Sequence, residues 1–258
     1  MTVADRQKPP PGDLYLDHVS HFVPDLDAAA AVLEGLGLRV TPASIQMVKG
    51  KPAGTSNRCA MLEEGYIELL APRPDRGLRL ACFGTPDAEA EYRRLADHGF
   101  EPPPIVDLSR KVDYGAEVRF KVVRTNDKMP EGRIQFVQQL TPAVIWREPF
   151  LNPFRLISIF VIAEDPVAAA ARWARFAALL PRRTDEGIRL DTARGAVIIG
   201  ERFPWRTPPA PALAGYGLAC GHPDVFAARC SASGLVVRKD THYSVELPQA
   251  LGGAWVFG

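Results

Sequence analysis

Residues 16–29 read Leu-Asp-His-Val-Ser-His-Phe-Val-Pro-Asp-Leu-Asp-Ala-Ala, and residues 65–72 read Gly-Tyr-Ile-Glu-Leu-Leu-Ala-Pro. The first stretch predicts a strand that carries His18 and turns at Pro24 and Asp25 into a helix, because an acidic turn is typical of a helix N-terminus. The second stretch predicts a strand with Glu68 in its middle. An imidazole and a carboxylate on two neighbouring strands can bind one divalent cation, so the pattern indicates a metal-binding cleft.

The composition is that of a globular protein with a full hydrophobic core, since 47% of the 258 residues are hydrophobic and 24% are charged. A formal net charge of +1 gives no concentrated basic surface, so we expect neither nucleic acid nor an anionic membrane as a partner. No run approaches the roughly 20 apolar residues of a membrane span. The polar, proline-rich residues 1–13 are expected to form a short flexible tail.

The four cysteines, Cys59, Cys82, Cys220 and Cys230, lie far apart with no short paired spacing. This spacing argues against a structural zinc site and favours reduced, buried thiols. A cytoplasmic location is therefore expected.

A weak internal repeat organises the chain. Four segments share the order strand, acidic or proline-containing turn, alanine-rich helix and further strands, and they begin near Leu14, Leu78, Leu156 and Gly215. A proline-rich connection separates the first two segments from the last two. We predict two domains of two modules each, with these bounds: modules 14–72 and 78–142, a linker at 143–153, and a second domain at 154–258.

The quoted strands and turn resemble those of the vicinal oxygen chelate superfamily, which includes glyoxalase I, methylmalonyl-CoA epimerase, extradiol dioxygenases and bleomycin-resistance proteins. More narrowly, residues 54–59 (Gly-Thr-Ser-Asn-Arg-Cys) and 138–142 (Gln-Gln-Leu-Thr-Pro) are similar to uncharacterised bacterial glyoxalase-like proteins with two such domains. The resemblance implies an α+β fold of tandem βαβββ modules, here four modules that form two pseudo-symmetric domains with curled mixed sheets.

The resemblance also implies a ligand set, with one residue on the first strand and one on the last strand of each of two paired modules. His18 and Glu68 match these positions in the first module. Aligning Thr141-Pro142 with Ala71-Pro72 puts Gln138 at the third position, and aligning the turns before the helices puts Leu80 at the fourth. The expected cofactor is a divalent metal, Zn, Mn, Ni or Fe, bound by His18, Glu68 and Gln138.

In the second domain the matching positions fall on apolar residues or glycine, at Leu156, Ile198, Gly217 and near Val256. We expect no metal there. An apolar cleft or a purely structural partner domain is the better interpretation of residues 154–258.

Five more residues are candidates for substrate binding. Arg58 follows the turn at residues 54–57, and Arg119 and Lys121 share one face of a strand, where they either bind an anion or form the solvated face of an edge strand. Tyr66 and Phe136 share faces with the expected ligands by period-two counting and are expected to form an apolar wall. His21 is expected to face away from His18, against a helix.

The first functional hypothesis is a metal-dependent lyase or isomerase of glyoxalase type that acts on a small oxygenated compound, with Glu68 as the base. The alternative is a metal-free protein of bleomycin-resistance type that binds or sequesters a small molecule in the same cleft. A third possibility is a degenerate domain with a structural role. A single suitably placed histidine argues against the two-histidine iron site of extradiol dioxygenases. Both a monomer and a homodimer are compatible with four modules.

Overall fold

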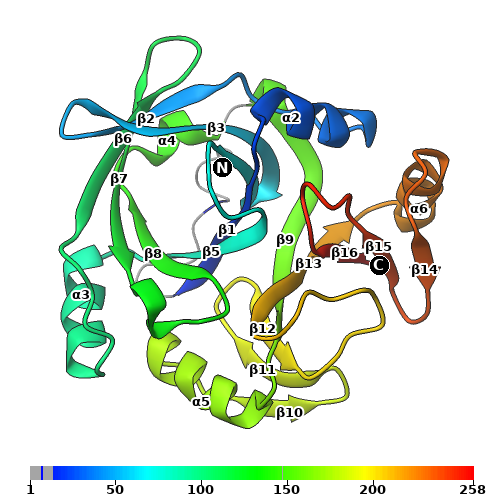
Figure 1. The fold of residues 1–258 in the computed structure, drawn as a ribbon. Coiled ribbons are helices and arrows are strands. Elements are labelled where there is room, and N and C mark those ends of the chain that lie inside the picture. The colour runs from blue at the N-terminus through cyan, green and yellow to red at the C-terminus, as the bar shows by residue number, and fades with distance from the viewer. Residues whose placement is uncertain (1–6, 8–13, 147) are drawn as a thin grey trace.

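A computed structural model describes residues 7, 14–146 and 148–258, and in it the chain forms four successive βαβββ units (Figure 1). The first two units are β1 (Tyr15–Phe22), α2 (Leu26–Gly35), β2 (Ser44–Val48), β3 (Lys51–Glu64), β4 (Tyr66–Ala71) and β5 (Gly77–Gly84), α3 (Ala88–Asp97), β6 (Val106–Lys111), β7 (Glu117–Arg124), β8 (Arg133–Gln139). The other two are β9 (Leu151–Ile162), α5 (Pro166–Ala177), β10 (Arg182–Thr184), β11 (Gly187–Asp191), β12 (Ala196–Gly200) and β13 (Ala212–Cys220), α6 (Pro223–Ala232), β14 (Val237–Lys239), β15 (Tyr243–Glu246), β16 (Ala254–Phe257). The predicted α+β fold of four βαβββ modules is thereby confirmed.

Short helices complete the described chain: η1 (Asn126–Lys128), α4 (Pro142–Ile145) and η2 (Glu148–Phe150). The last two and the start of β9 occupy the predicted linker. The predicted tail, residues 1–13, lies outside the described residues except for Gln7.

Acidic side chains cap α2, α3 and α5, whereas His222, at the N-cap of α6, makes no side-chain capping hydrogen bond. The Asp25 carboxylate accepts hydrogen bonds from the backbone N–H groups of Asp27 and Ala28, at 2.8 and 3.0 Å, before α2. Asp87 and Asp165 do the same at α3 and α5. These contacts satisfy N–H groups that the first helical turn leaves unpaired and so fix where each helix begins.

The first two units close into a barrel. Their strands pair in the order β3-β2-β6-β7-β8-β5-β1-β4, and β4 pairs again with β3. Strand β1 lies between β4, to which it is parallel, and β5, to which it is antiparallel. All eight residues of β1 are buried, so its side chains face either the barrel interior or the surrounding core.

The last two units do not close. Their strands pair in the order β14-β15-β16-β13-β9-β12-β11-β10, and within the described residues β14 and β10 each have one neighbour. Strand β9 also pairs in parallel with β3, where Met61 lies opposite Leu151, so one sheet runs through the molecule. We call residues 14–145 the N-terminal half and residues 148–258 the C-terminal half. Their behaviour as separate domains stays a prediction.

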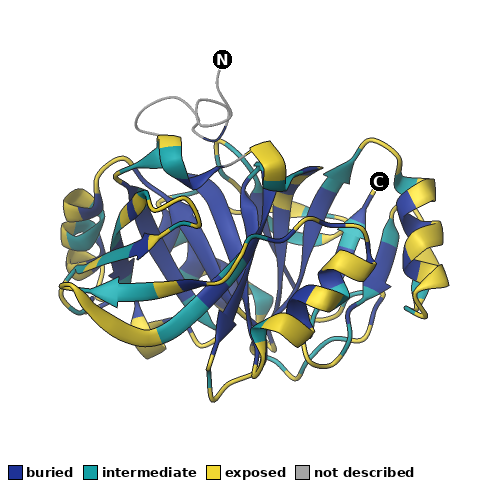
Figure 2. Cartoon of the chain, turned by 90° about the horizontal axis from the view of Figure 1, so that it is seen from above, coloured by how far each residue is buried: buried dark blue, intermediate teal, exposed yellow. Residues whose placement is uncertain are grey.

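The strands carry most of the buried residues, and the helices lie on the outside with exposed outer faces (Figure 2). Helix α5 of the third unit packs against the N-terminal half, where Phe176 stacks on Phe136 with ring centroids 4.5 Å apart. One hydrophobic cluster contains residues of both halves, so the halves stabilise each other. Within the described residues, the helices are too short or too polar to span a membrane.

Candidate functional site

A polar pocket lies inside the barrel of the N-terminal half. It encloses about 50 Å³, which is room for roughly three to five water molecules. Its apolar wall consists of Leu70, Leu80, Leu108, Phe120, Val122 and Val137. Its polar side chains are His18, Gln46, Asn57, Tyr66, Glu68, Gln135 and three arginines.

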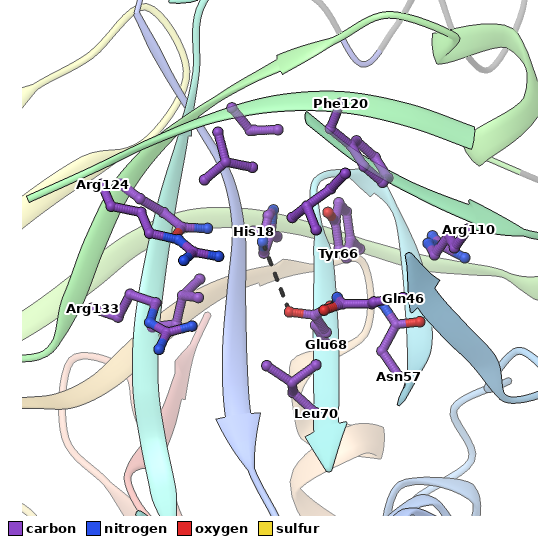
Figure 3. Close-up of a pocket in the computed structure, with 15 residues that line it drawn as sticks. His18, Gln46, Asn57, Tyr66, Glu68, Leu70, Arg110, Phe120, Arg124 and Arg133 are labelled. Atoms are coloured by element: carbon purple, nitrogen blue, oxygen red, sulfur yellow. Dashed lines mark hydrogen bonds and ion pairs between the residues drawn. The ribbon is translucent and has the colours of Figure 1, made fainter. Parts of the chain in front are cut away.

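His18 lies on β1 with its ring fixed on both sides. Its Nδ1 donates a hydrogen bond of 2.6 Å to the buried Asp17 carboxylate, and its ring stacks on Tyr66 with centroids 4.3 Å apart. The Nε2 atom then faces Glu68, 4.0 Å from Oε2 (Figure 3). Burial by itself lowers the pKa of His18, but the neighbouring Cys82 and the hydrogen bond with Asp17 outweigh it and raise this pKa well above its usual value.

Glu68 lies on β4 and accepts three hydrogen bonds. The hydroxyl of Ser20 donates to Oε2, and the amides of Asn57 and Gln46 donate to Oε1 at 2.6 and 3.4 Å. These donors come from β1, β2 and β3 and compensate the burial of the carboxylate. Tyr66, two residues earlier, keeps its proton because burial and then the charges of Asp17 and Glu68 raise the pKa of its phenol.

Gln135 holds in the second unit the position that Glu68 holds in the first. Ser20 lies five residues before the helix cap Asp25 and pairs with Glu68 across the strands. In the same way, Cys82 lies five residues before the helix cap Asp87 and pairs with Gln135. The Gln135 Nε2 donates to the Cys82 sulfur at 3.7 Å, as Ser20 donates to Glu68. The buried Oε1 of Gln135 has no hydrogen-bond partner among the described residues, which leaves an oxygen ligand available in the pocket.

The sequence-based choice of Gln138 is corrected by this geometry. Gln138 lies on the other face of β8, where its amide donates to the Pro86 carbonyl at 2.7 Å and accepts from Ala88 N–H at 3.2 Å. The alignment failed because it counted back from the following proline, and Pro142 lies seven residues after Gln135 whereas Pro72 lies four residues after Glu68. An odd offset moves a side chain to the opposite face of a strand.

Only Tyr66 of the five predicted substrate-binding residues lines the pocket. Phe136 is fully buried in the core outside the barrel, against Phe176. Arg58 binds the outer helix α2 through Asp27 and Glu34, at 2.9 and 3.0 Å. The remaining two, Arg119 and Lys121, project outward from β7, the latter paired with Glu89 at 3.0 Å.

Sequence reasoning missed three pocket arginines, Arg110, Arg124 and Arg133. They lie on β6, β7 and β8. The alternation of β7 was recognised, but its more highly charged face was selected, whereas Phe120, Val122 and Arg124 face the pocket. Figure 3 shows Arg124 and Arg133 together on one side of His18 and Glu68 and Arg110 on the other side.

The spacing of His18 and Glu68 is compatible with two ligands of one divalent cation. Two ligand atoms that bind one ion at 2.0–2.2 Å each lie about 3 to 4 Å apart, and the 4.0 Å between His18 Nε2 and Glu68 Oε2 is at the wide end of that range. The bond from Asp17 to Nδ1 is the support that metal-binding imidazoles usually have. Within the described residues, no three His, Cys, Asp or Glu side chains form a metal-binding group, so a third protein ligand would be the amide oxygen of Gln135.

Solved structures with this fold include proteins of different activities. A hypothetical protein from Staphylococcus aureus is 14% identical with a TM-score of 0.68, over 95% of this chain and 99% of that chain. A catechol 2,3-dioxygenase is 14% identical with a TM-score of 0.57, over 96% and 93%. A Mn(II)-bound glyoxalase from Novosphingobium aromaticivorans is 10% identical with a TM-score of 0.57, over 94% and 81%. At these identities the likeness concerns the fold.

A search of the curated proteins gives no match. The family model of the glyoxalase-like domain, in contrast, matches residues 16–80 and 75–177. The matched stretch contains both pocket strands β1 and β4 and the whole barrel, and it spans more than half of the chain. The protein therefore belongs to the glyoxalase-like domain family of the vicinal oxygen chelate superfamily.

Proposed function

We propose that this protein is a divalent-metal-dependent lyase or isomerase of glyoxalase type, which acts on a small oxygenated compound in the barrel of the N-terminal half. The observation that carries the proposal is the position of His18, whose Nδ1 is held by Asp17 and whose Nε2 lies 4.0 Å from Glu68 Oε2, beside the Gln135 oxygen that has no partner among the described residues. His18, Glu68 and Gln135 would hold the cation, which is Zn, Mn, Ni or Fe in this proposal.

A cation bound there would supply Lewis-acid polarisation of substrate oxygens. Glu68 is the one carboxylate among the described lining residues, and it would serve as the base only after it leaves the cation, when its freed oxygen can take a proton from the substrate and return it. Ser20 and Asn57 orient its two oxygens. Gln135 does not titrate, so this chemistry uses a single base. The small cavity and the wall formed by Leu70 and Leu80 restrict water around the reacting atoms.

The alternative function is metal-free binding of a small molecule, as in bleomycin-resistance proteins. One observation favours it: the hydrogen bonds from Ser20, Asn57 and Gln46 already satisfy Glu68, and the fourth ligand position is occupied by Leu80. In this case the same side chains would form hydrogen bonds to the ligand directly.

We further propose a cytoplasmic protein, either a monomer or a homodimer, whose partner is a small molecule. All four cysteines are free thiols, which supports a reducing compartment.

Metal content after dialysis against a mixture of Zn, Mn, Ni and Fe salts tests the two functions. We expect near-stoichiometric metal in the wild type and loss of it in the His18→Ala/Glu68→Ala double variant, measured by elemental analysis. Metal that is equally abundant in both proteins, or absent from both, contradicts the metal-dependent function.

Two glutamines of β8 provide a matched pair for the third ligand. Gln135→Leu is expected to weaken metal binding, because it removes the free oxygen from the pocket. Gln138→Leu removes the same functional group from the outer face of the same strand and is expected to leave metal binding unchanged. Equal effects of the two substitutions would exclude Gln135 as a ligand.

A further inference from the structure

Three guanidinium groups gather at one side of the pocket without an acidic partner. Arg124 and Arg133 line the pocket, and Arg73, on the loop after β4, shares the ring of Phe22 with Arg133 at 4.7 and 5.5 Å from the ring centroid. No carboxylate among the described residues lies within ion-pair distance of Arg73, Arg124 or Arg133. The Nε atoms of Arg73 and Arg124 are buried and have no hydrogen-bond partner in the described chain.

This arrangement is energetically unfavourable in the free protein. Burial, followed by the charges of Arg73 and Arg124, lowers the pKa of Arg133 to about 10, although the charges of Glu68 and Asp75 oppose the shift. The pKa of Arg124 is lowered for the same two reasons, burial and the charge of Arg73. A bound anion would relieve the repulsion among these half-buried cations.

Three other half-buried arginines pair with carboxylates, whereas the buried Arg110, which also lines the pocket, and Arg194 have no ion pair within the described residues. Arg58 pairs with Asp27 and Glu34, Arg94 with Glu91 at 2.6 Å, and Arg172 with Glu131. Arg58 thereby links strand β3 to helix α2, whereas Arg94 pairs within α3 and donates to carbonyls of α5. Arg73, Arg124 and Arg133 make no ion pair with a carboxylate of the described chain, so their charges are available for a ligand.

We infer that Arg73, Arg124 and Arg133 form an anion subsite, which binds the carboxylate or phosphate group of a small substrate whose remaining oxygens reach His18 and Glu68. Guanidinium groups bind both anions in a bidentate manner. The cavity of about 50 Å³ limits the substrate to a compact anion. The anion subsite itself does not depend on a metal, but its role in a reaction rests on the proposed function.

Binding of acetate and of inorganic phosphate to metal-free protein at constant ionic strength tests the inference. Calorimetric titration gives the affinity, and acetamide is the neutral control for acetate. We expect one of the anions to bind the wild type while acetamide does not, and the tighter anion identifies the substrate group. The Arg124→Gln/Arg133→Gln variant should lose about ten- to a hundredfold in affinity, because two charged hydrogen-bond donors are removed.

Arg119→Gln is the matched control, since it removes the same charge from the outer face of β7 and should leave anion affinity unchanged. The single variant Arg133→Gln should fold and melt at a higher temperature than the wild type in anion-free buffer, because it relieves repulsion. Failure of both anions to bind the wild type, or an equal loss with Arg119→Gln, overturns the inference.

The two proposals fail separately. His18→Ala abolishes metal binding in the proposed function but should retain anion binding in metal-free protein. Anion binding without any metal binding contradicts only the metal-dependent function, and metal binding without anion binding contradicts only the subsite.

Discussion

The two halves of the molecule are built from the same modules but have opposite interiors. In the N-terminal half the paired strands place His18, Glu68 and Gln135 in a polar pocket. The same register in the C-terminal half places Ser158, and not the expected Leu156, at the position of His18; Ile198 lies at the position of Glu68 and Val256 at that of Gln135.

The loop after the fourth strand of each half shows the same contrast. In the N-terminal half this loop carries Arg73, which lies over Phe22 beside the pocket. In the C-terminal half it carries Phe203 and Trp205, which stack on each other at 4.9 Å and pack against Phe160. These aromatic side chains form part of the wall of a cavity of about 560 Å³ in the C-terminal half. One module architecture thus supports a charged cavity where the sheet closes and a hydrophobic cluster where it stays open.

Trp205→Ala tests this difference with the largest expected effect. Trp205 is buried and donates from Nε1 to the Ala214 carbonyl at 3.2 Å, so its removal should lower the free energy of unfolding by about 3 to 5 kcal/mol. Chemical denaturation measures the loss. Leu180→Ala, at a side chain 91% exposed, should change stability by less than about 0.5 kcal/mol. A changed metal or anion affinity in Trp205→Ala would show that the halves do not function separately.

His21 couples the halves, and its titration should weaken that coupling in acid. Its Nδ1 donates to the Leu251 carbonyl at 2.7 Å, which leaves Nε2 to accept from the Tyr216 hydroxyl at 3.0 Å. Burial lowers the pKa of His21 from 6.5 to about 4, although the bond to Leu251 opposes the shift.

The unfolded chain therefore takes up this proton at a higher pH than the folded protein does. The contribution of His21 is full above pH 6.5 and is lost as the pH falls toward 4, by about 3 kcal/mol in total. Urea denaturation at several pH values between 4 and 6.5 measures the slope of the unfolding free energy against pH. His21→Gln should flatten it and the exposed His98→Gln should not; an unchanged slope in His21→Gln would contradict the assignment.

Leu80→His would make the N-terminal half more unlike its partner by filling the fourth ligand position. We expect the affinity for Zn to rise about tenfold or more, because an imidazole replaces water in the coordination shell. Competition with a chelator measures the change. Leu70→His places the same group elsewhere on the pocket wall, and an equal gain there would show that position does not matter.

Arg58→Gln should have the smallest effect and should be purely structural. Its pairs with Asp27 and Glu34 are partly exposed, so we expect a loss of at most about 1 kcal/mol in unfolding free energy. Anion affinity, measured as for the arginine cluster, should equal that of the wild type. Weaker anion binding in Arg58→Gln would instead support the sequence-based prediction that Arg58 binds the substrate.

Much of the fold was predictable because its signals are local. Proline and aspartate at each turn, an alanine-rich helix and a period-two strand pattern recur in each unit, and they fix the order of elements without long-range information. His18 and Glu68 were found for the same reason, since each lies in the middle of a strand with a characteristic neighbourhood. Most of the pocket-lining residues were missed, because exposure to the pocket depends on which strand face the barrel encloses.

The sequence by itself determined the four βαβββ units, the capped helix starts, and the histidine and glutamate of the first unit. The tertiary structure decided which face of β8 lines the cavity, and so replaced Gln138 by Gln135, because pairing register and connection length set that face. It also decided that Arg73, Arg124 and Arg133, far apart along the chain, meet beside Glu68. Local patterns encode elements, whereas closure of the sheet brings distant side chains together.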